Sequence, residues 1–400
     1  MNLSNRASNT PASPIRKLFP KASEAEKKGI KIYKLNIGQP DLKTPNCIKK
    51  RCQNYPKDLV YEPSPGIPEL ISTWAKYFAK DNLPVTDKDL IITTGGSEAI
   101  VFSLLATCDP NDEVIVFEPF YANYKSYAIQ TSVKLVPVTL KIEDNFHLPN
   151  AEEIEKKITS KTKAILINNP SNPTGAVYKK NELQMITDLA IKHNLFIISD
   201  EVYNEFVLDK KNKFISLMSF PKIQQQLILI ESASKKFNAC GARIGALVSK
   251  NSEIIATVTK FAQARLSSPS IEQYALIPIF KTAKKYTQKI CQEYKKRRDT
   301  IFNGLKKIKG AICLKPEGAF YVIVKLPVDD TEKFCAWLLD KFEYKKQTVM
   351  LAPAKDFYAT PNMGLQEVRI AYVLKSQDLK KAMEILKIAI EEYNKIYAKK

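Results

Sequence analysis

From residue 90 onward, short apolar runs alternate with segments of helical pattern, and no other feature of the sequence constrains the fold as strongly. Seven of these runs have the length and composition of buried strands, and most are separated by enough chain for a helix. Such alternation is typical of a largely parallel sheet covered by helices on both faces. We therefore predict an α/β fold whose large domain contains a mostly parallel seven-stranded sheet, with strands at residues 90–94, 113–117, 134–138, 163–167, 195–199, 227–230 and 244–248.

Both ends of the chain differ from this pattern. The first 30 residues indicate an irregular arm and a helix at 15–28, with a bend or a late start at Pro20, and a strand is expected at 31–37. After residue 285 come a long basic helix at 286–307, strands at 318–324 and 367–372, and a final helix at 376–397. We predict an N-terminal arm with part of a small domain (1–40), a large domain (41–285) and a small α+β C-terminal domain (286–400).

The composition is that of an ordinary soluble protein, with 44% hydrophobic and 26% charged residues. No apolar run approaches the roughly 18 residues of a membrane span, and the polar N-terminus lacks the apolar core of a secretory signal. We expect a cytoplasmic protein without a membrane partner. The seven cysteines form no Cys-x-x-Cys pair and there are two histidines, so we expect free thiols and no metal site.

The net charge of +20 is the one unusual bulk property. A basic chain can bind nucleic acid or an anionic membrane. The lysines are spread along the chain, however, and no aromatic-interleaved basic block or helix-turn-helix pattern stands out. We favour a solvated lysine-rich surface and expect no nucleic-acid partner, although the charge suits anionic substrates and a phosphorylated cofactor.

A lysine, two serines and an arginine follow the apolar run at 227–230. A lysine that leaves a buried strand can lie beside a pocket, where partial desolvation lowers its pKa and frees the amine as a nucleophile. Serine and arginine side chains can donate hydrogen bonds to a phosphate. The set Ser232, Ser234, Lys235 and Arg243 therefore suits pyridoxal phosphate (PLP), which needs an amine and a phosphate anchor. Taken alone, a lysine in such a string is more often solvated.

Two other expected strand ends carry groups of the same kind. Gly95, Gly96 and Ser97 lie between a strand and a helix, where free helix N–H groups bind phosphate. An ordinary glycine turn explains them equally well. Tyr121 follows the second strand, at the edge where open α/β sheets bind ligands, and its ring can stack on a flat ligand. A core aromatic is the alternative.

The fourth and fifth expected strands are followed by polar groups. Residues 168–175 contain two Asn-Pro bonds, and this rigid loop would aim Asn172 at a ligand. Asp200 can pair with a protonated ring nitrogen or simply cap a helix. Tyr203, three residues on, can reach a neighbouring oxygen.

Two further residues indicate a ligand site outside these strands. Gly38 allows the backbone to approach a ligand closely, although a surface turn explains it as well. Arg369 stands in an otherwise apolar strand, where it either pairs with an internal acid or awaits a carboxylate ligand in bidentate geometry.

Taken together and in this order, the motifs resemble those of the class I/II PLP-dependent aminotransferases of the aspartate aminotransferase superfamily. The strongest markers are Asn172-Pro173-Thr174-Gly175 and the string from Ser232 through Lys235 to Arg243. The resemblance runs from Gly38 to Arg369. It implies the PLP-dependent transferase fold, PLP as cofactor, amino acid and 2-oxo acid substrates, and a homodimer with active sites at the subunit interface.

The resemblance also implies a role for each site residue. Lys235 would bind PLP covalently and move the proton, Asp200 would keep the pyridine nitrogen protonated, and Tyr203 would contact the phenolic oxygen; these three are the catalytic candidates. Arg369 would bind the substrate α-carboxylate. The remaining positions would hold the cofactor (Tyr61 from the other subunit, Gly95, Gly96, Ser97, Tyr121, Asn172, Ser232 and Arg243) or assist at the carboxylate (Gly38 and Asn172).

Departures from the family pattern limit what can be expected of the substrate. Ser97 stands where some relatives carry a lysine for a distal carboxylate, and Ala122 replaces a common proline. Arg265 would bind a distal carboxylate or, more plausibly, form an interface salt bridge. Lys236 is expected to be solvated or near the phosphate.

Aspartate and 2-oxoglutarate are the expected substrates, in a ping-pong reaction. A PLP-dependent carbon–sulfur lyase on the same scaffold is the alternative. A PLP-sensing DNA-binding regulator is a weaker one, because only about 30 residues precede the enzyme-like region, too few for a DNA-binding domain.

Overall fold

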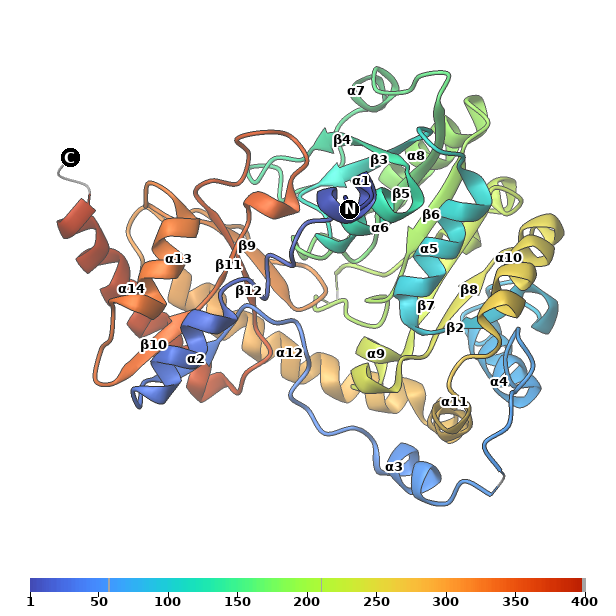
Figure 1. Ribbon diagram of the computed structural model, residues 1–400, viewed down its shortest axis with the longest axis horizontal. Helices are drawn as coiled ribbons and strands as arrows, with labels where there is room; N and C mark the ends of the chain where they lie inside the picture. The colour runs from blue at the N-terminus through green and yellow to red at the C-terminus, as the bar shows by residue number, and fades with distance from the viewer. Residues whose placement is uncertain (57, 210, 398–400) are drawn as a thin grey trace.

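The computed structural model describes residues 1–56, 58–209 and 211–397, and its centre is a seven-stranded sheet (Figure 1). The strand order is β2-β8-β7-β6-β5-β3-β4, and all strands are parallel except β8, which runs antiparallel to β2 and β7. The strands are β2 (Leu90–Thr93), β3 (Glu113–Glu118), β4 (Lys134–Thr139), β5 (Thr162–Asn168), β6 (Phe196–Asp200), β7 (Leu227–Ser232) and β8 (Gly245–Val248).

Alternate residues of these strands enter two different cores, because side chains point to opposite faces of a strand. In β5, Ala164 and Leu166 pack in the cluster that contains α5 and α10 residues, whereas Ile165 and Ile167 pack in the cluster that contains α4 and α8 residues. The large-domain helices are α3 (Asn46–Gln53), α4 (Pro68–Ala79), α5 (Gly95–Thr107), α6 (Asn123–Thr131), α7 (Ala151–Glu155), α8 (Lys180–Lys192), α9 (Ala233–Lys236), α10 (Ser252–Arg265) and α11 (Ser270–Leu276).

A smaller α+β body contains both ends of the chain (Figure 1). It has an antiparallel sheet, β11-β12-β9, and a parallel pair, β1-β10. Its strands are β1 (Lys31–Lys34), β9 (Tyr321–Lys325), β10 (Gln347–Met350), β11 (Ala352–Pro353) and β12 (Glu367–Ala371); its helices are α2 (Phe19–Lys27), α13 (Thr331–Asp340) and α14 (Ser376–Tyr397). Helix α12 (Ala283–Leu305) runs from this body along the large one, and the short α1 (Asn5–Asn9) contacts α6.

The observed elements confirm the predicted fold class, and all seven predicted strands form the large sheet. The helix expected at 15–28 begins later, at Phe19, because Pro20 fits the first turn of a helix but not its interior. The short strands β10 and β11 were not predicted. All seven cysteines are free thiols. Within the described ranges, no helix is long and apolar enough to cross a membrane.

Candidate active site

The predicted site residues meet at the edge of the sheet where its parallel strands end. Asp200 is the last residue of β6, and the helix α5 begins two residues after β2. Lys235 follows β7 in the short helix α9, and Asn172 follows β5 in a loop with cis bonds before Pro170 and Pro173. Parallel strands bring their carboxyl ends to one edge, which explains why positions so far apart in sequence converge.

The amine of Lys235 lies in this group. Its Nζ donates a hydrogen bond to the Gly38 carbonyl at 2.9 Å, and the Cys240 Sγ is 3.8 Å away. Gly38 is required here, because a Cβ at that position would lie 1.7 Å from the Tyr321 hydroxyl oxygen. Lys235 is half-buried, so it is not enclosed in the core.

Asp200 is a buried carboxylate whose hydrogen-bond donors are both neutral. Its Oδ2 accepts a hydrogen bond of 2.6 Å from the Tyr124 hydroxyl, and its Oδ1 one of 3.3 Å from the Val202 N–H. Burial raises the pKa of Asp200 to about 6, although both hydrogen bonds lower it. A buried carboxylate without a positive partner is suited to receive a cationic ligand group.

Arg369 is a buried cation in a complementary position. It is 1% exposed, its Nη1 donates to the Asn172 Oδ1 at 3.0 Å, and its Nη2 donates to the Asn36 carbonyl at 2.6 Å. Its Nε has no hydrogen-bond partner, and no carboxylate of the described chain forms an ion pair with it. Burial lowers the pKa of Arg369. The alternative of an internal acid partner is therefore not observed, and the free Nε fits a carboxylate ligand.

Aromatic side chains surround this arginine. The Tyr321 ring centre lies 4.6 Å from the Arg369 guanidinium carbon, and the Phe357 ring centre 5.0 Å from it. The Tyr321 hydroxyl is 2.9 Å from that of Tyr203, which is 3% exposed. Burial raises the pKa of Tyr203 above its usual value, so the phenol stays protonated and can donate a hydrogen bond.

A cradle suited to phosphate forms where α5 begins. Gly95 has φ of +75°, and a Cβ there would lie 2.5 Å from the Arg243 Nη2. The guanidinium therefore lies against the N-terminal turn of a helix, where N–H groups are free. Ser232 caps α9, because its hydroxyl accepts from the Ser234 N–H at 3.1 Å. Among the described residues, Arg243 forms no ion pair with an acid, so its charge is free for an anion.

Tyr127 and Tyr121 lie near the phosphate cradle, whereas Tyr61 does not. The Ser97 hydroxyl accepts a hydrogen bond from the Tyr127 hydroxyl at 2.8 Å, so Ser97 is held beside the cradle. Tyr121 is half-buried, and its ring meets that of Tyr124 edge-on at 5.5 Å. Tyr61 behaves differently, because it is 77% exposed and the structure does not bring it to the other predicted residues.

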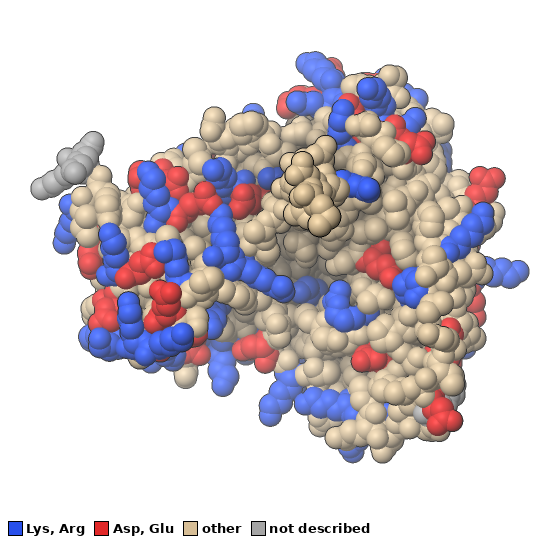
Figure 2. All heavy atoms as spheres, viewed as in Figure 1, with Lys and Arg blue, Asp and Glu red and all other residues tan. Residues whose placement is uncertain are grey.

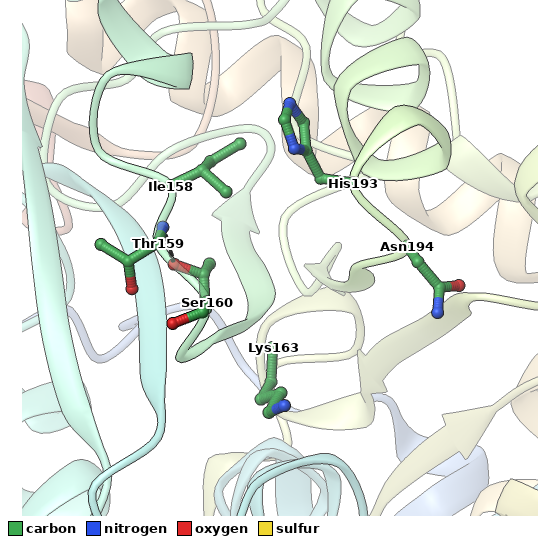
Figure 3. Close-up of a pocket in the computed structure, with 7 residues that line it drawn as sticks. Ile158, Thr159, Ser160, Lys163, His193 and Asn194 are labelled. Carbon is green, nitrogen blue, oxygen red and sulfur yellow. Dashed lines mark hydrogen bonds between the residues drawn. The ribbon is translucent and has the colours of Figure 1, made fainter.

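The surface and its hollows agree with this location. The face in Figure 2 is hollowed near its centre, with basic side chains at the margin. A hollow of about 610 Å³ adjoins the site and is lined in part by Gln39, Asn238 and Cys240. Another, of about 470 Å³, contains Lys163 and His193 (Figure 3). It lies where β5 begins, at the opposite edge of the sheet, and contains none of the predicted site residues.

Comparison with known proteins decides the family. The profile of the family described as aminotransferase class I and II matches residues 30–386. The chain belongs to this family. It is a PLP-dependent aminotransferase, which confirms the enzyme class and the cofactor expected from the sequence.

Relatives of this aminotransferase match it over nearly its whole length. A probable aspartate/prephenate aminotransferase of Aquifex aeolicus is 32% identical over 406 residues, covering 98% of this chain and 99% of the relative. The solved aspartate aminotransferase from Thermus thermophilus with maleate has a TM-score of 0.87 at 29% identity, covering 97% and 100% of the two chains. An alanine aminotransferase from Pyrococcus furiosus has a TM-score of 0.89 at 29% identity, covering 98% and 100%.

One expectation about a neighbouring residue needs correction in this aminotransferase. Lys236 is not solvated; its side chain is 0% exposed and its Nζ lies 2.8 Å from the Glu231 Oε1. Within the chain, Arg265 donates to the Ser268 hydroxyl at 2.5 Å and the Ser64 carbonyl at 3.2 Å, and it lies 3.6 Å from Glu98.

Sequence reasoning also missed several residues of the site. Tyr124 and Tyr127 follow Tyr121 at intervals of three, a spacing that places side chains on one helix face and gives a usable signal. Asn36 and Tyr321 had no such signal, because they reach Arg369 only through the pairing of distant strands.

Proposed function

We propose that this aminotransferase exchanges an amino group between L-aspartate and 2-oxoglutarate. The observation that carries the amino-acid site is Arg369, a buried guanidinium with a free Nε beside Asn172. Its geometry suits the α-carboxylate that every such substrate carries. Aspartate is proposed because aspartate aminotransferases of Thermotoga maritima and Bacillus subtilis are among its relatives.

The residues at the sheet edge fit the cofactor. Asp200 would pair with the protonated ring nitrogen, Tyr203 and Asn172 would contact the ring oxygen, and Tyr121 would cover the ring. The phosphate would lie on the α5 N-terminus, held by Gly95, Gly96, Ser97, Ser232 and Arg243. PLP, when bound, supplies an electron sink for the electron pair left at the substrate Cα.

The protein's own groups would carry out the proton transfers. Arg369 fixes the substrate carboxylate, with the Gly38 backbone and the Asn172 side chain beside it. The Lys235 amine would hold the cofactor, and with substrate bound it would take the proton from Cα as a general base. The burial of Arg369 and Asp200 strengthens both charge interactions, because the local dielectric is low.

We also propose a homodimer. Leu59, Val60 and Tyr61 are consecutive and 73%, 59% and 77% exposed, an apolar run that favours contact with a second copy. In that arrangement Tyr61 would enter the partner's phosphate cradle. The free cysteines favour a reducing compartment such as the cytoplasm.

Product analysis tests the reaction. With aspartate and 2-oxoglutarate we expect glutamate to form in amounts equal to the aspartate consumed, and none when either substrate is omitted. A panel with alanine as donor tests the side-chain preference. Pyruvate and ammonia from a cysteine conjugate, without any 2-oxo acid, would instead establish the carbon–sulfur lyase.

A further inference from the structure

Lys236 follows the proposed catalytic lysine directly and is buried with an acidic partner. Both Lys236 and Glu231 are 0% exposed, and the Lys236 Nζ lies 2.8 Å and 3.0 Å from the two Glu231 carboxylate oxygens. Burying a charge is costly unless it is paired and hydrogen-bonded. Each of the two buried charges therefore depends on the other, and removing one would leave an unpaired charge in this part of the core.

The two adjacent lysines point in opposite directions. Lys235 reaches the Gly38 carbonyl in the site, whereas Lys236 turns back to Glu231 near the end of β7. Helix α9, which ends with these two lysines, has only four residues, Ala233–Lys236, too few to be stable as an isolated helix. The ion pair between Glu231 and Lys236 joins the end of β7 to the end of α9.

Further contacts attach the pair to surrounding elements. Glu231 accepts a hydrogen bond from Asn204, the residue after Tyr203. The Lys236 Nζ lies 4.8 Å from the Tyr77 ring centre in α4. Burial alone would raise the pKa of Glu205, but the positive charges of Lys236 and Lys284 bring it below its usual value. The Lys236 charge therefore interacts with Glu231, Glu205 and the Tyr77 ring.

We propose that Lys236 is a positioning residue that fixes the α9 turn through Glu231, so that the Lys235 amine reaches the substrate Cα proton. This inference rests on the proposed role of Lys235. Removing the pair would leave carboxylate binding at Arg369 intact but let the amine move from its reactive position. A displacement of about 1 Å at a reacting group can lower a rate by up to about a hundredfold.

The test compares Lys236→Met, Lys236→Arg and the double variant Glu231→Gln/Lys236→Met with Lys285→Met, a control at an exposed lysine of α12. Each is measured with saturating PLP for kcat and for the KM of aspartate. For both Lys236→Met forms we expect kcat to fall about tenfold, with KM within about twofold of wild type. Lys236→Arg restores most of kcat, and Lys285→Met changes neither constant.

The double variant covers the case in which Lys236→Met alone does not fold, because it buries no unpaired charge. Wild-type kcat in either folded Met form would overturn the proposal, as would a rise in KM equal to the loss in kcat. Borohydride reduction followed by mass spectrometry separates this inference from the proposed function. Cofactor fixed on Lys235 in the Met forms supports the positioning role of Lys236. Cofactor fixed on another residue in wild type would refute the role of Lys235 itself.

Discussion

Asp200 shows how a single buried residue trades stability for function. Its pKa is raised to about 6 by burial, so below that pH the native protein holds a proton that the unfolded chain loses near its ordinary value of 3.8. Native protein then binds more protons than unfolded protein. The contribution of Asp200 to the free energy of unfolding therefore falls as pH rises from 4 to 6 and stays low above that range.

Asp200→Asn removes this penalty. In the cofactor-free protein we expect the free energy of unfolding at pH 7 to rise by about 2–3 kcal/mol relative to wild type. The gain should disappear at pH 4, because wild-type Asp200 is then protonated. Urea unfolding at the two pH values measures the difference. An equal effect at both pH values would mean that packing, not ionisation, sets the change.

Arg369→Lys tests substrate binding at the same scale. A lysine keeps the charge but cannot form the bidentate contact with a carboxylate. We expect KM for the amino acid to rise about a hundredfold, equivalent to about 2.7 kcal/mol. The absorbance of bound PLP should stay as in wild type. Unchanged KM would remove Arg369 from the carboxylate site.

At the scale of elements, the large sheet could be predicted, but the short strand β11 and the contacts of the turn after β7 could not. The strands of the large sheet are continuous apolar runs, as expected of parallel strands buried on both faces. Strand β11 has two residues, too few to give a pattern. Lys236 was misjudged because Ser-x-Ser-Lys-Lys reads as polar surface, and nothing in sequence spacing shows that the turn folds back onto Glu231.

The turn from β2 into α5 gives a prediction about cofactor affinity. Gly95→Ala puts a methyl group against Arg243 at a positive φ, so the cradle must open. We expect PLP affinity to fall at least about tenfold, equivalent to about 1.4 kcal/mol. Gly241→Ala is the matched control, because no heavy atom lies within 4 Å of a Cβ there. Titration of cofactor-free protein with PLP measures both, and equal affinities would argue against this cradle.

At the scale of the whole molecule, basic and acidic side chains are mixed on the face shown in Figure 2. Lysine and arginine are interspersed there with aspartate and glutamate over the smaller body. Such mixing is typical of a solvated surface. The convergence of Asn36, Tyr321 and Arg369 could not be predicted from sequence, because it needs the relative position of two sheets.

The proposed dimer makes a further prediction at this scale. Val60 is 59% exposed in one chain, so Val60→Glu costs little in a monomer but would bury a charge in a dimer interface. We expect wild type to elute as a dimer in size-exclusion chromatography with light scattering, and Val60→Glu to shift toward monomer and bind PLP more weakly. A wild-type monomer with full activity would contradict the shared site.

The visible absorption spectrum of the PLP-loaded protein, before and after aspartate, tests the central claim most directly. We predict a band from the cofactor bound through Lys235 that disappears on adding aspartate and returns on adding 2-oxoglutarate. Lys235→Ala should lack this band. If Lys235→Ala retained the wild-type band and its response to aspartate, the assignment of Lys235, and with it the proposed chemistry, would be wrong.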